Sequence, residues 1–433
     1  MKKTKWNRTT CFYRCFGGFL LTNFTDSGDY LKKQEIDFRL RDGDKRIAPR
    51  INELNQEYRG NFRVLQGGLI HRKEFDECIK AIEDEKSTII SGNAGYGKSG
   101  CTEAILNYCD ERKIPHIAIK LDRRIPHKNC EIWGKELGLP ESIAHSINCI
   151  SKEENAVIIL DQLDALRWTQ ANSSEAIAVC MELIRQVECL NCKREKKIII
   201  IFVCRTYDLE NDNNINSLFE KKENCEDNWT IVKVADFDQD VVKKIVGEQY
   251  EQLSYRLKKI LRIPSNLYIW QHLDKEETYT DCLTTSHLID KWFEQICRRS
   301  VTVGLQQKSV NETKKNIVDV LDESGRLYVP KHILHVDEAG LDYLVSSEII
   351  LIQNNRVGFV HQSILDCFIS HKMMEKYFSG MEIENIIGDK YKQTPGKRYQ
   401  VQMFLQNLLE YDSNDFILIG EKMLSSEAHH HLV

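Results

Sequence analysis

Apolar runs and helical patterns alternate through the middle of the chain. Five short runs rich in isoleucine and valine predict β-strands, and the segments between them carry apolar residues at helical spacing. The predicted strands are 88–90, 117–121, 156–160, 198–204 and 230–234, and the predicted helices are 72–83, 102–112, 130–137 and 174–191. Alternation of this kind predicts an α/β fold with a parallel, doubly wound sheet of about five strands.

The strand pattern stops after residue 236, and helices take over. The predicted helices of this part are 240–263, 266–273, 286–299, 311–321 and 363–377. Two apolar runs, 348–353 and 356–360, are joined by Asn354-Asn355, a favourable pair for a tight hairpin turn. Helices followed by a small hairpin indicate a helical domain and then a winged-helix-like domain.

A glycine-rich turn links the strand at 88–90 to the helical pattern that follows it. The turn matches G-x-x-x-x-G-K-[ST]. Glycines in it permit backbone torsions that aim successive N–H groups at phosphate oxygens. Lys98 can neutralise the β- and γ-phosphates, and the Ser99 hydroxyl can bind Mg²⁺. The residues expected to bind nucleotide are Gly92, Asn93, Ala94, Gly95, Tyr96, Gly97, Lys98, Ser99 and Gly100.

Charged residues follow two of the other predicted strands. Asp161 comes directly after the apolar run 156–160, where an acid can hold Mg²⁺ beside the phosphates. Asp164 could orient the attacking water. Arg205 follows the run 198–204, and ligands of parallel sheets sit at the carboxyl ends of the strands. We therefore expect Lys98, Asp161, Asp164 and Arg205 to be catalytic, with Ser99 and Asp161 as Mg²⁺ ligands.

Composition sets limits on the function. The 433 residues are 42% hydrophobic and 29% charged, with a formal net charge of −5. The charge gives no basic bias, so a nucleic-acid partner is not expected. The apolar runs are too short to cross a bilayer, so no membrane association is expected. Fifteen cysteines lie scattered, mostly in apolar segments, which indicates a reducing, cytoplasmic location.

The later motifs carry a family resemblance. Together with the phosphate loop, the supporting segments are Leu160-Asp161-Gln162-Leu163-Asp164-Ala165, Cys204-Arg205-Thr206, Leu261-Arg262-Ile263-Pro264-Ser265-Asn266-Leu267 and Phe359-Val360-His361-Gln362-Ser363-Ile364-Leu365-Asp366. On these, residues 70–375 resemble STAND-class P-loop NTPases, the signal-transduction ATPases that include NACHT and NB-ARC proteins, and especially the bacterial antiviral members.

The resemblance implies a role for two further residues. It implies that Pro264 packs on the adenine of ATP or ADP and that His361 reaches the β-phosphate of ADP and holds the resting state. Arg262 stands where eukaryotic relatives usually have glycine, which leaves the adenine contact of Pro264 open. The resemblance also implies homo-oligomerisation on activation, and a protein ligand, such as a phage protein, sensed by a C-terminal region that is not fully present.

These patterns predict five regions. They are an N-terminal adaptor or partly disordered region at 1–68 with a short helix at 51–58, a P-loop NTPase domain at 69–238, a helical domain at 239–300, a winged-helix-like domain at 301–378 and the start of a C-terminal helical region at 379–433.

The expected function is a slow ATPase used as an ADP/ATP-controlled oligomerisation switch, by resemblance in antiphage defence. One alternative is a motor or remodelling ATPase of the AAA+ type, for which Arg124 is the one tentative arginine finger. Another is a nucleotide-regulated DNA-binding protein that uses the predicted helix 363–377, whose basic face is weak.

Overall fold

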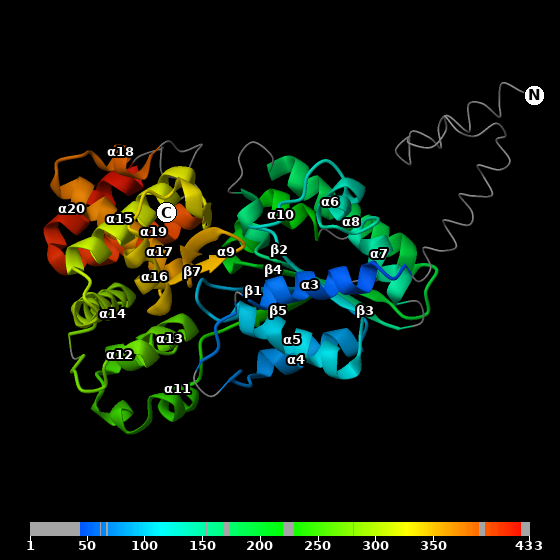
Figure 1. Cartoon of the computed structure of the whole chain (residues 1–433), viewed down its shortest axis with the longest axis horizontal. Coiled ribbons are helices and arrows are strands. Elements are labelled where there is room, and N and C mark those ends of the chain that lie inside the picture. The colour runs from blue at the N-terminus through cyan, green and yellow to red at the C-terminus, as the bar shows by residue number, and fades with distance from the viewer. Residues whose placement is uncertain are drawn as a thin grey trace, which may run out of the picture.

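The structure is a computed structural model that describes residues 44–60, 62–65, 68–151, 154–167, 173–219, 229–279, 281–388 and 395–425. The histidines at 429–431 and the first 43 residues of the predicted N-terminal region lie outside the described residues. An α/β part and a mainly helical part lie side by side, as Figure 1 shows.

A five-stranded parallel sheet forms the centre of the α/β part, which confirms the predicted fold class. The strands are β1 (Thr88–Gly92), β2 (His116–Lys120), β3 (Ala156–Asp161), β4 (Ile198–Cys204) and β5 (Thr230–Val234), in the order β2-β3-β4-β1-β5. Strand β4 therefore lies between the strand that enters the phosphate loop and the strand that ends at Asp161. This order brings the ends of β1, β3 and β4 together.

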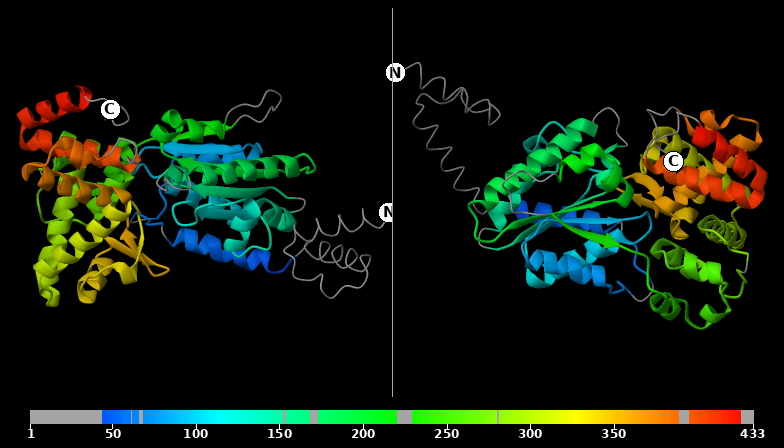
Figure 2. Two further views of the ribbon diagram at one scale, coloured as in Figure 1. Left: turned by 90° about the horizontal axis from the view of Figure 1, so that it is seen from above. Right: turned by 180° about the vertical axis from the view of Figure 1, so that it is seen from behind.

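Helices cover both faces of the sheet (Figure 2). One face packs on α4 (Lys73–Glu83) and α5 (Lys98–Arg112), and the other on α6 (Cys130–Glu136), α7 (Ile143–Ile150) and α8 (Ser173–Asn191). In β4, Ile198, Ile200 and Phe202 pack toward α8, while alternate residues pack toward α5. Burial on both faces explains why β4 is apolar throughout. Helices α7, α9 (Thr206–Asn211) and α10 (Asn213–Ser217) were not predicted.

Helix α3 (Ile47–Arg59) packs along the edge strand β2. The Asn55 side chain donates to the carbonyl of His116 at 2.9 Å and accepts from the backbone N–H of Ala118 at 2.8 Å. These bonds satisfy backbone groups of β2 that a sheet edge leaves unpaired. The helix predicted at 51–58 is therefore longer and belongs to the core of the α/β part, which corrects its assignment to a separate N-terminal region. The other domain boundaries stay predictions.

The C-terminal part follows β5. Its helices are α11 (Gln239–Val246), α12 (Tyr255–Ile260), α13 (Pro264–His272), α14 (Thr285–Ser300), α15 (Gln307–Ser324), α16 (Glu338–Ser346), α17 (Gln362–Phe378), α18 (Ile383–Ile387), α19 (Pro395–Tyr411) and α20 (Ser413–Ser425). Strands β6 (Val329–Pro330), β8 (Arg356–Phe359) and β7 (Ile350–Gln353) form a small antiparallel sheet in that order. One continuous apolar core runs through this part, from Phe237 to Met423. We call residues 237–425 the C-terminal module.

Two predictions about the module can be compared with the structure. The hairpin is confirmed: Asn354 and Asn355 have φ angles of 49° and 59°, the positive values that a two-residue hairpin turn requires. The single helix predicted at 240–263 is wrong. Gly247, with φ of 74°, ends α11, and the Ser254 hydroxyl caps α12 by accepting from the N–H of Leu257 at 3.1 Å.

Helix α17 occupies the centre of the module rather than its surface. Most of its first nine residues are buried, and it packs against α14, α15, α18 and α19. The first half of α17 is enclosed by its neighbours and cannot enter a DNA groove. The DNA-binding alternative, whose basic residues lie in the second half of the helix, stays a prediction. None of the described helices is long and apolar enough for a bilayer crossing.

Candidate nucleotide site

The phosphate loop connects β1 to α5. It lies at the carboxyl ends of the strands, on the side of the sheet that faces the C-terminal module. Gly95 and Gly97 have φ angles of 78° and 86°, which other residues rarely adopt. Lys98 is the first residue of α5, and its Nζ donates to the carbonyls of Gly92 at 2.8 Å and Asn93 at 3.0 Å. Burial lowers the pKa of Lys98. The two hydrogen bonds hold the ammonium group inside the loop, where it can bind a phosphate.

Asp161 ends β3 and is buried beside the loop. Its Oδ2 accepts a hydrogen bond from the hydroxyl of Tyr58 at 2.9 Å, and its Oδ1 accepts from the N–H of Gln162 at 2.8 Å. The Tyr58 oxygen also lies 2.7 Å from Oγ1 of Thr102, on α5. Tyr58 thus joins the strand that carries the acid to the helix that carries Ser99. Sequence analysis missed it, because it lies 103 positions before Asp161.

Arg205 follows β4 and links both parts of the protein. Its Nε lies 3.0 Å from Oδ2 of Asp164, and both side chains are nearly buried. Its Nη2 donates to Oε1 of Gln362, the first residue of α17. The predicted pair of catalytic residues is therefore an ion pair, which is held in turn by the C-terminal module.

Pro264 meets the phosphate loop from the module. It is the first residue of α13, and the N–H of Ser265 donates to the carbonyl of Gly95 at 3.1 Å. A Cβ atom at Gly97 would lie 3.3 Å from Cγ of Pro264. Arg262 points elsewhere, since its Nε donates to the carbonyl of Phe237 at 2.8 Å. The departure at Arg262 therefore leaves Pro264 free to line the site.

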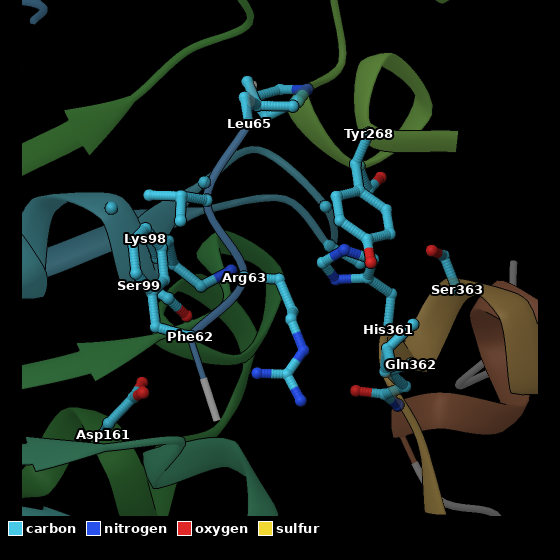
Figure 3. Close-up of a pocket in the computed structure, with 18 of the residues that line it drawn as sticks. Phe62, Arg63, Leu65, Lys98, Ser99, Asp161, Tyr268, His361, Gln362 and Ser363 are labelled. Carbon is cyan, nitrogen blue, oxygen red and sulfur yellow. The ribbon is translucent and has the colours of Figure 1, made fainter. Parts of the chain in front are cut away.

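His361 precedes α17 and faces the loop across a cavity, as Figure 3 shows. Its ring packs edge-on against Tyr268, with ring centroids 4.8 Å apart. Burial, assisted by Lys120 and Arg63, lowers the pKa of His361 to about 4, so the imidazole is neutral at pH 7.

Three adjacent residues at the start of α17 leave buried polar atoms without hydrogen-bond partners among the described residues. They are Nε2 of His361, Nε2 of Gln362 and Oγ of Ser363. Buried polar groups without partners cost free energy, so such a set indicates a ligand. All three residues line the same cavity, of about 220 Å³, as the phosphate loop.

A segment that sequence analysis missed crosses this cavity. Residues 62–65, the crossing segment, run between the phosphate loop and Tyr268, and Arg63 extends into the space between Lys98 and Gln362 (Figure 3). No periodic pattern marked the segment. Lys120 and Gln162, which follow the same rule as Asp161 because they lie at strand ends, could have been found from the sequence.

The structure brings most of the predicted residues to one cavity. Its lining includes Ala94, Gly95, Gly97, Lys98, Ser99, Gly100, Asp161, Asp164, Arg205, Pro264 and His361. Of the remaining loop residues, Gly92 and Asn93 hold Lys98, and Tyr96 packs against the core while its carbonyl accepts from Arg72. Nucleotide contacts of individual residues stay predictions.

Comparison with known proteins bears on this geometry. Residues 88–227 match the model of the ATPase family associated with various cellular activities, AAA. The chain contains an AAA-family P-loop ATPase domain. It is thus a nucleotide-binding domain, and ATP hydrolysis is the general activity of its family. No curated protein matches the sequence.

Solved structures with similar folds were also found. A Walker-type ATPase of Pyrococcus abyssi has 13% identity and a TM-score of 0.37, covering 71% of this chain and 98% of that one. Cdc6p of Pyrobaculum aerophilum has 13% identity and a TM-score of 0.30, covering 69% and 92%. The replication initiator DnaA, bound to AMPPCP and single-stranded DNA, has 13% identity and a TM-score of 0.31, covering 86% and 98%.

These similarities assign neither a substrate nor an assembly to this chain. The DnaA structure contains single-stranded DNA, but a TM-score of 0.31 does not assign that partner to this chain, and the expectation against a nucleic-acid partner stays a prediction. The STAND class and the role in antiphage defence stay predictions, whereas the broader expectation of a P-loop ATPase domain is confirmed by the family match.

Proposed function

We propose that this protein is an ATP-dependent switch in which the bound nucleotide controls how tightly the C-terminal module closes on the ATPase domain. One observation carries the proposal: Arg205, at the end of β4, is bound at once by Asp164 of the ATPase domain and by Gln362 of the module. An arginine at this end of a parallel sheet can reach the γ-phosphate of ATP. The γ-phosphate and Gln362 therefore compete for one guanidinium group.

The competition gives each nucleotide a different effect. ADP has no γ-phosphate, so Arg205 stays on Gln362 and the module stays closed. ATP draws Arg205 toward the phosphate and weakens its bond to α17. A ligand shifts a conformational equilibrium only by its differential affinity for the two states. Here the γ-phosphate supplies that difference.

The module is suited to move as one body. Its helices and the small sheet share one apolar core, so opening has to occur around residues 235–238, between β5 and α11. Arg72 braces this segment by donating to the carbonyl of Ala235 at 2.6 Å, and Arg262 pairs with Asp236 at 3.1 Å. In this proposal the helices and the small sheet of the module move together, whereas the family resemblance implied that the winged-helix-like domain would move alone.

Hydrolysis would reset the switch. The Ser99 hydroxyl and the Asp161 carboxylate are hard oxygen ligands that suit Mg²⁺, which usually takes one or two protein ligands together with phosphate oxygens. Mg²⁺ would neutralise charge on the phosphates. When Arg205 moves to the phosphate, Asp164 loses its partner and can accept a proton from the attacking water. Hydrolysis thus depends on the same movement that opens the module.

The family match supports the AAA part of the alternative, but the motor role has less support among the described residues. Its tentative arginine finger, Arg124, pairs with Glu57 of the same chain at 2.9 Å. Arg123 packs over the ring of Tyr328 at 3.9 Å and donates to Gln353, so it belongs to the contact with the module. Both arginines thus have partners within their own chain.

The test compares the full chain with ADP and with a non-hydrolysable ATP analogue and Mg²⁺, by small-angle X-ray scattering and light scattering. A compact monomer with ADP and an expanded or oligomeric form with the analogue are expected. Steady-state turnover of about 10⁻² s⁻¹ or slower would fit an unassisted switch. Identical scattering with both nucleotides, or turnover above about 1 s⁻¹, would contradict the proposal.

A further inference from the structure

A cluster of three metal-ligating side chains lies between α14 and α17, outside the lining of the nucleotide cavity. Sγ of Cys367 lies 3.7 Å from Nε2 of His371, and this nitrogen lies 3.5 Å from Oδ2 of Asp290. Cys367 and His371 are four residues apart on α17, so they share one helical face. Asp290 faces them from α14.

The separations fit a tetrahedral zinc site. Zinc bonds of about 2.3 Å to sulfur and about 2.0 Å to nitrogen or oxygen put neighbouring ligand atoms roughly 3.3–3.7 Å apart. Ser286 supplies a fourth polar group. Its Oγ lies 3.1 Å from Sγ of Cys367 and 3.3 Å from Nε2 of His371. The hydroxyl can bind the metal directly or hold a water that does.

The electrostatic surroundings disfavour charge on these side chains when no cation is bound. Burial raises the pKa of Asp290 to about 7 and that of Cys367 well above its usual range, and it lowers the pKa of His371 to about 4. A bound metal ion reverses the first two effects, because it deprotonates a ligating thiol or carboxyl group. The ammonium group of Lys314 is the competing charge, and it lies 4.6 Å over the rings of Phe293 and Phe368.

The cluster is also accessible. Cys367 is fully buried, but the side chains of Asp290 and His371 remain 37% and 32% exposed. A metal ion can therefore enter from solvent and find the thiolate beneath. Thiolate, imidazole and carboxylate together suit zinc rather than calcium or magnesium, which prefer oxygen ligands alone.

We propose that Cys367, His371 and Asp290 bind one zinc ion, with the Ser286 hydroxyl or a water in the fourth position. The ion would join α14 of the helical region to α17, the helix whose first residue holds Arg205. The ion would stiffen the C-terminal module. Loss of the bond between Arg205 and Gln362 would then release the module as a whole.

The test measures metal in the full chain, purified without chelator, reconstituted with zinc and then dialysed. About one zinc ion per chain is expected. Cys367→Ser and His371→Gln should each reduce the bound zinc at least about tenfold, whereas Ser286→Ala should weaken affinity roughly 10–100-fold and keep the stoichiometry. Cys297→Ser is the matched control, a buried cysteine on α14 outside the cluster, and it should keep its zinc.

Cobalt substitution gives a second readout that reports the sulfur ligand itself. Co²⁺ in the wild-type chain should show a thiolate charge-transfer absorption band that Cys367→Ser abolishes and Cys297→Ser retains. Bound zinc below about 0.1 per chain after reconstitution, or a cobalt band that persists in Cys367→Ser, would overturn the proposal. Because serine nearly matches cysteine in size, this variant keeps the test decisive if His371→Gln does not fold.

Discussion

Nη2 of Arg205 donates a hydrogen bond to Oε1 of Gln362, a residue 157 positions further along the chain. The bond joins the end of a central strand of the ATPase domain to the first residue of the central helix of the C-terminal module. The guanidinium group is the one that a γ-phosphate would claim. The contact between the two domains thus uses the same guanidinium group that the proposed switch assigns to the γ-phosphate.

Replacing Gln362 should therefore loosen the closed state. Gln362→Ala removes a hydrogen bond to a charged group, worth about 1.5–3 kcal/mol, so ADP should dissociate roughly 10–100-fold faster. Gln362→Glu places a carboxylate opposite Arg205 and should slow dissociation instead. Release of a fluorescent ADP analogue, followed by stopped flow, measures both. Equal acceleration in the two variants would show that the Arg205 contact does not hold the nucleotide.

Lys98 should carry much of the nucleotide affinity. Its Nζ is fixed by the Gly92 and Asn93 carbonyls, and a charge-assisted contact to phosphate is worth about 1.5–3 kcal/mol. Lys98→Ala should weaken ADP binding roughly 10–100-fold in calorimetric titrations. Lys80→Ala, an exposed lysine on α4, is the control and should bind ADP as the wild type does. Unchanged ADP affinity in Lys98→Ala would contradict the assignment of the phosphate loop to the nucleotide site.

Tyr58 should matter for stability although it is far from the loop in sequence. Tyr58→Phe deletes the hydroxyl that bonds to Asp161 and Thr102, which leaves buried polar groups with fewer partners. We expect the free energy of unfolding to fall by about 1–3 kcal/mol. Tyr108→Phe, which removes a bond to Glu83 at the surface, should cost less than about 0.5 kcal/mol. Chemical denaturation of both variants provides the comparison, and equal losses would argue against a special role for Tyr58.

The nucleotide-free protein should lose stability in mild acid through His361. The pKa of this buried imidazole is about 4, below the value of about 6.5 expected in the unfolded chain. A depressed histidine pKa stabilises the fold above the unfolded value, and this contribution disappears as the pH falls from about 6.5 to 4. The loss is about 3 kcal/mol at most.

Thermal unfolding across this pH range tests the prediction. His361→Gln should flatten the decline relative to wild type, while His145→Gln, which replaces an exposed histidine on α7, should follow the wild-type curve. Because other histidines with a lowered pKa, such as His371, contribute to the same decline, only the difference between variants is diagnostic. Parallel curves for His361→Gln and wild type would show that the His361 imidazole does not contribute to the decline and is not buried with a lowered pKa.

The sequence alone determined the parts of the site that lie in single short segments. Apolar runs ending at Asp161 and Arg205, and the glycines before Lys98, encode strand ends and a phosphate loop locally. The local pattern also identified the hairpin at Asn354-Asn355. It failed for 240–263, where one glycine with positive φ divided a continuous helical pattern.

Only the tertiary structure decided which of these parts meet. Strand order placed β4 between β1 and β3, and chain folding brought Tyr58 to Asp161 and Gln362 to Arg205. The same packing buried α17 and set Asp290 against Cys367. The periodicity of apolar residues shows which face of an element is buried, because apolar side chains are buried and polar ones are exposed. Periodicity does not show which distant element covers that face, since many pairings of elements would bury the same apolar area.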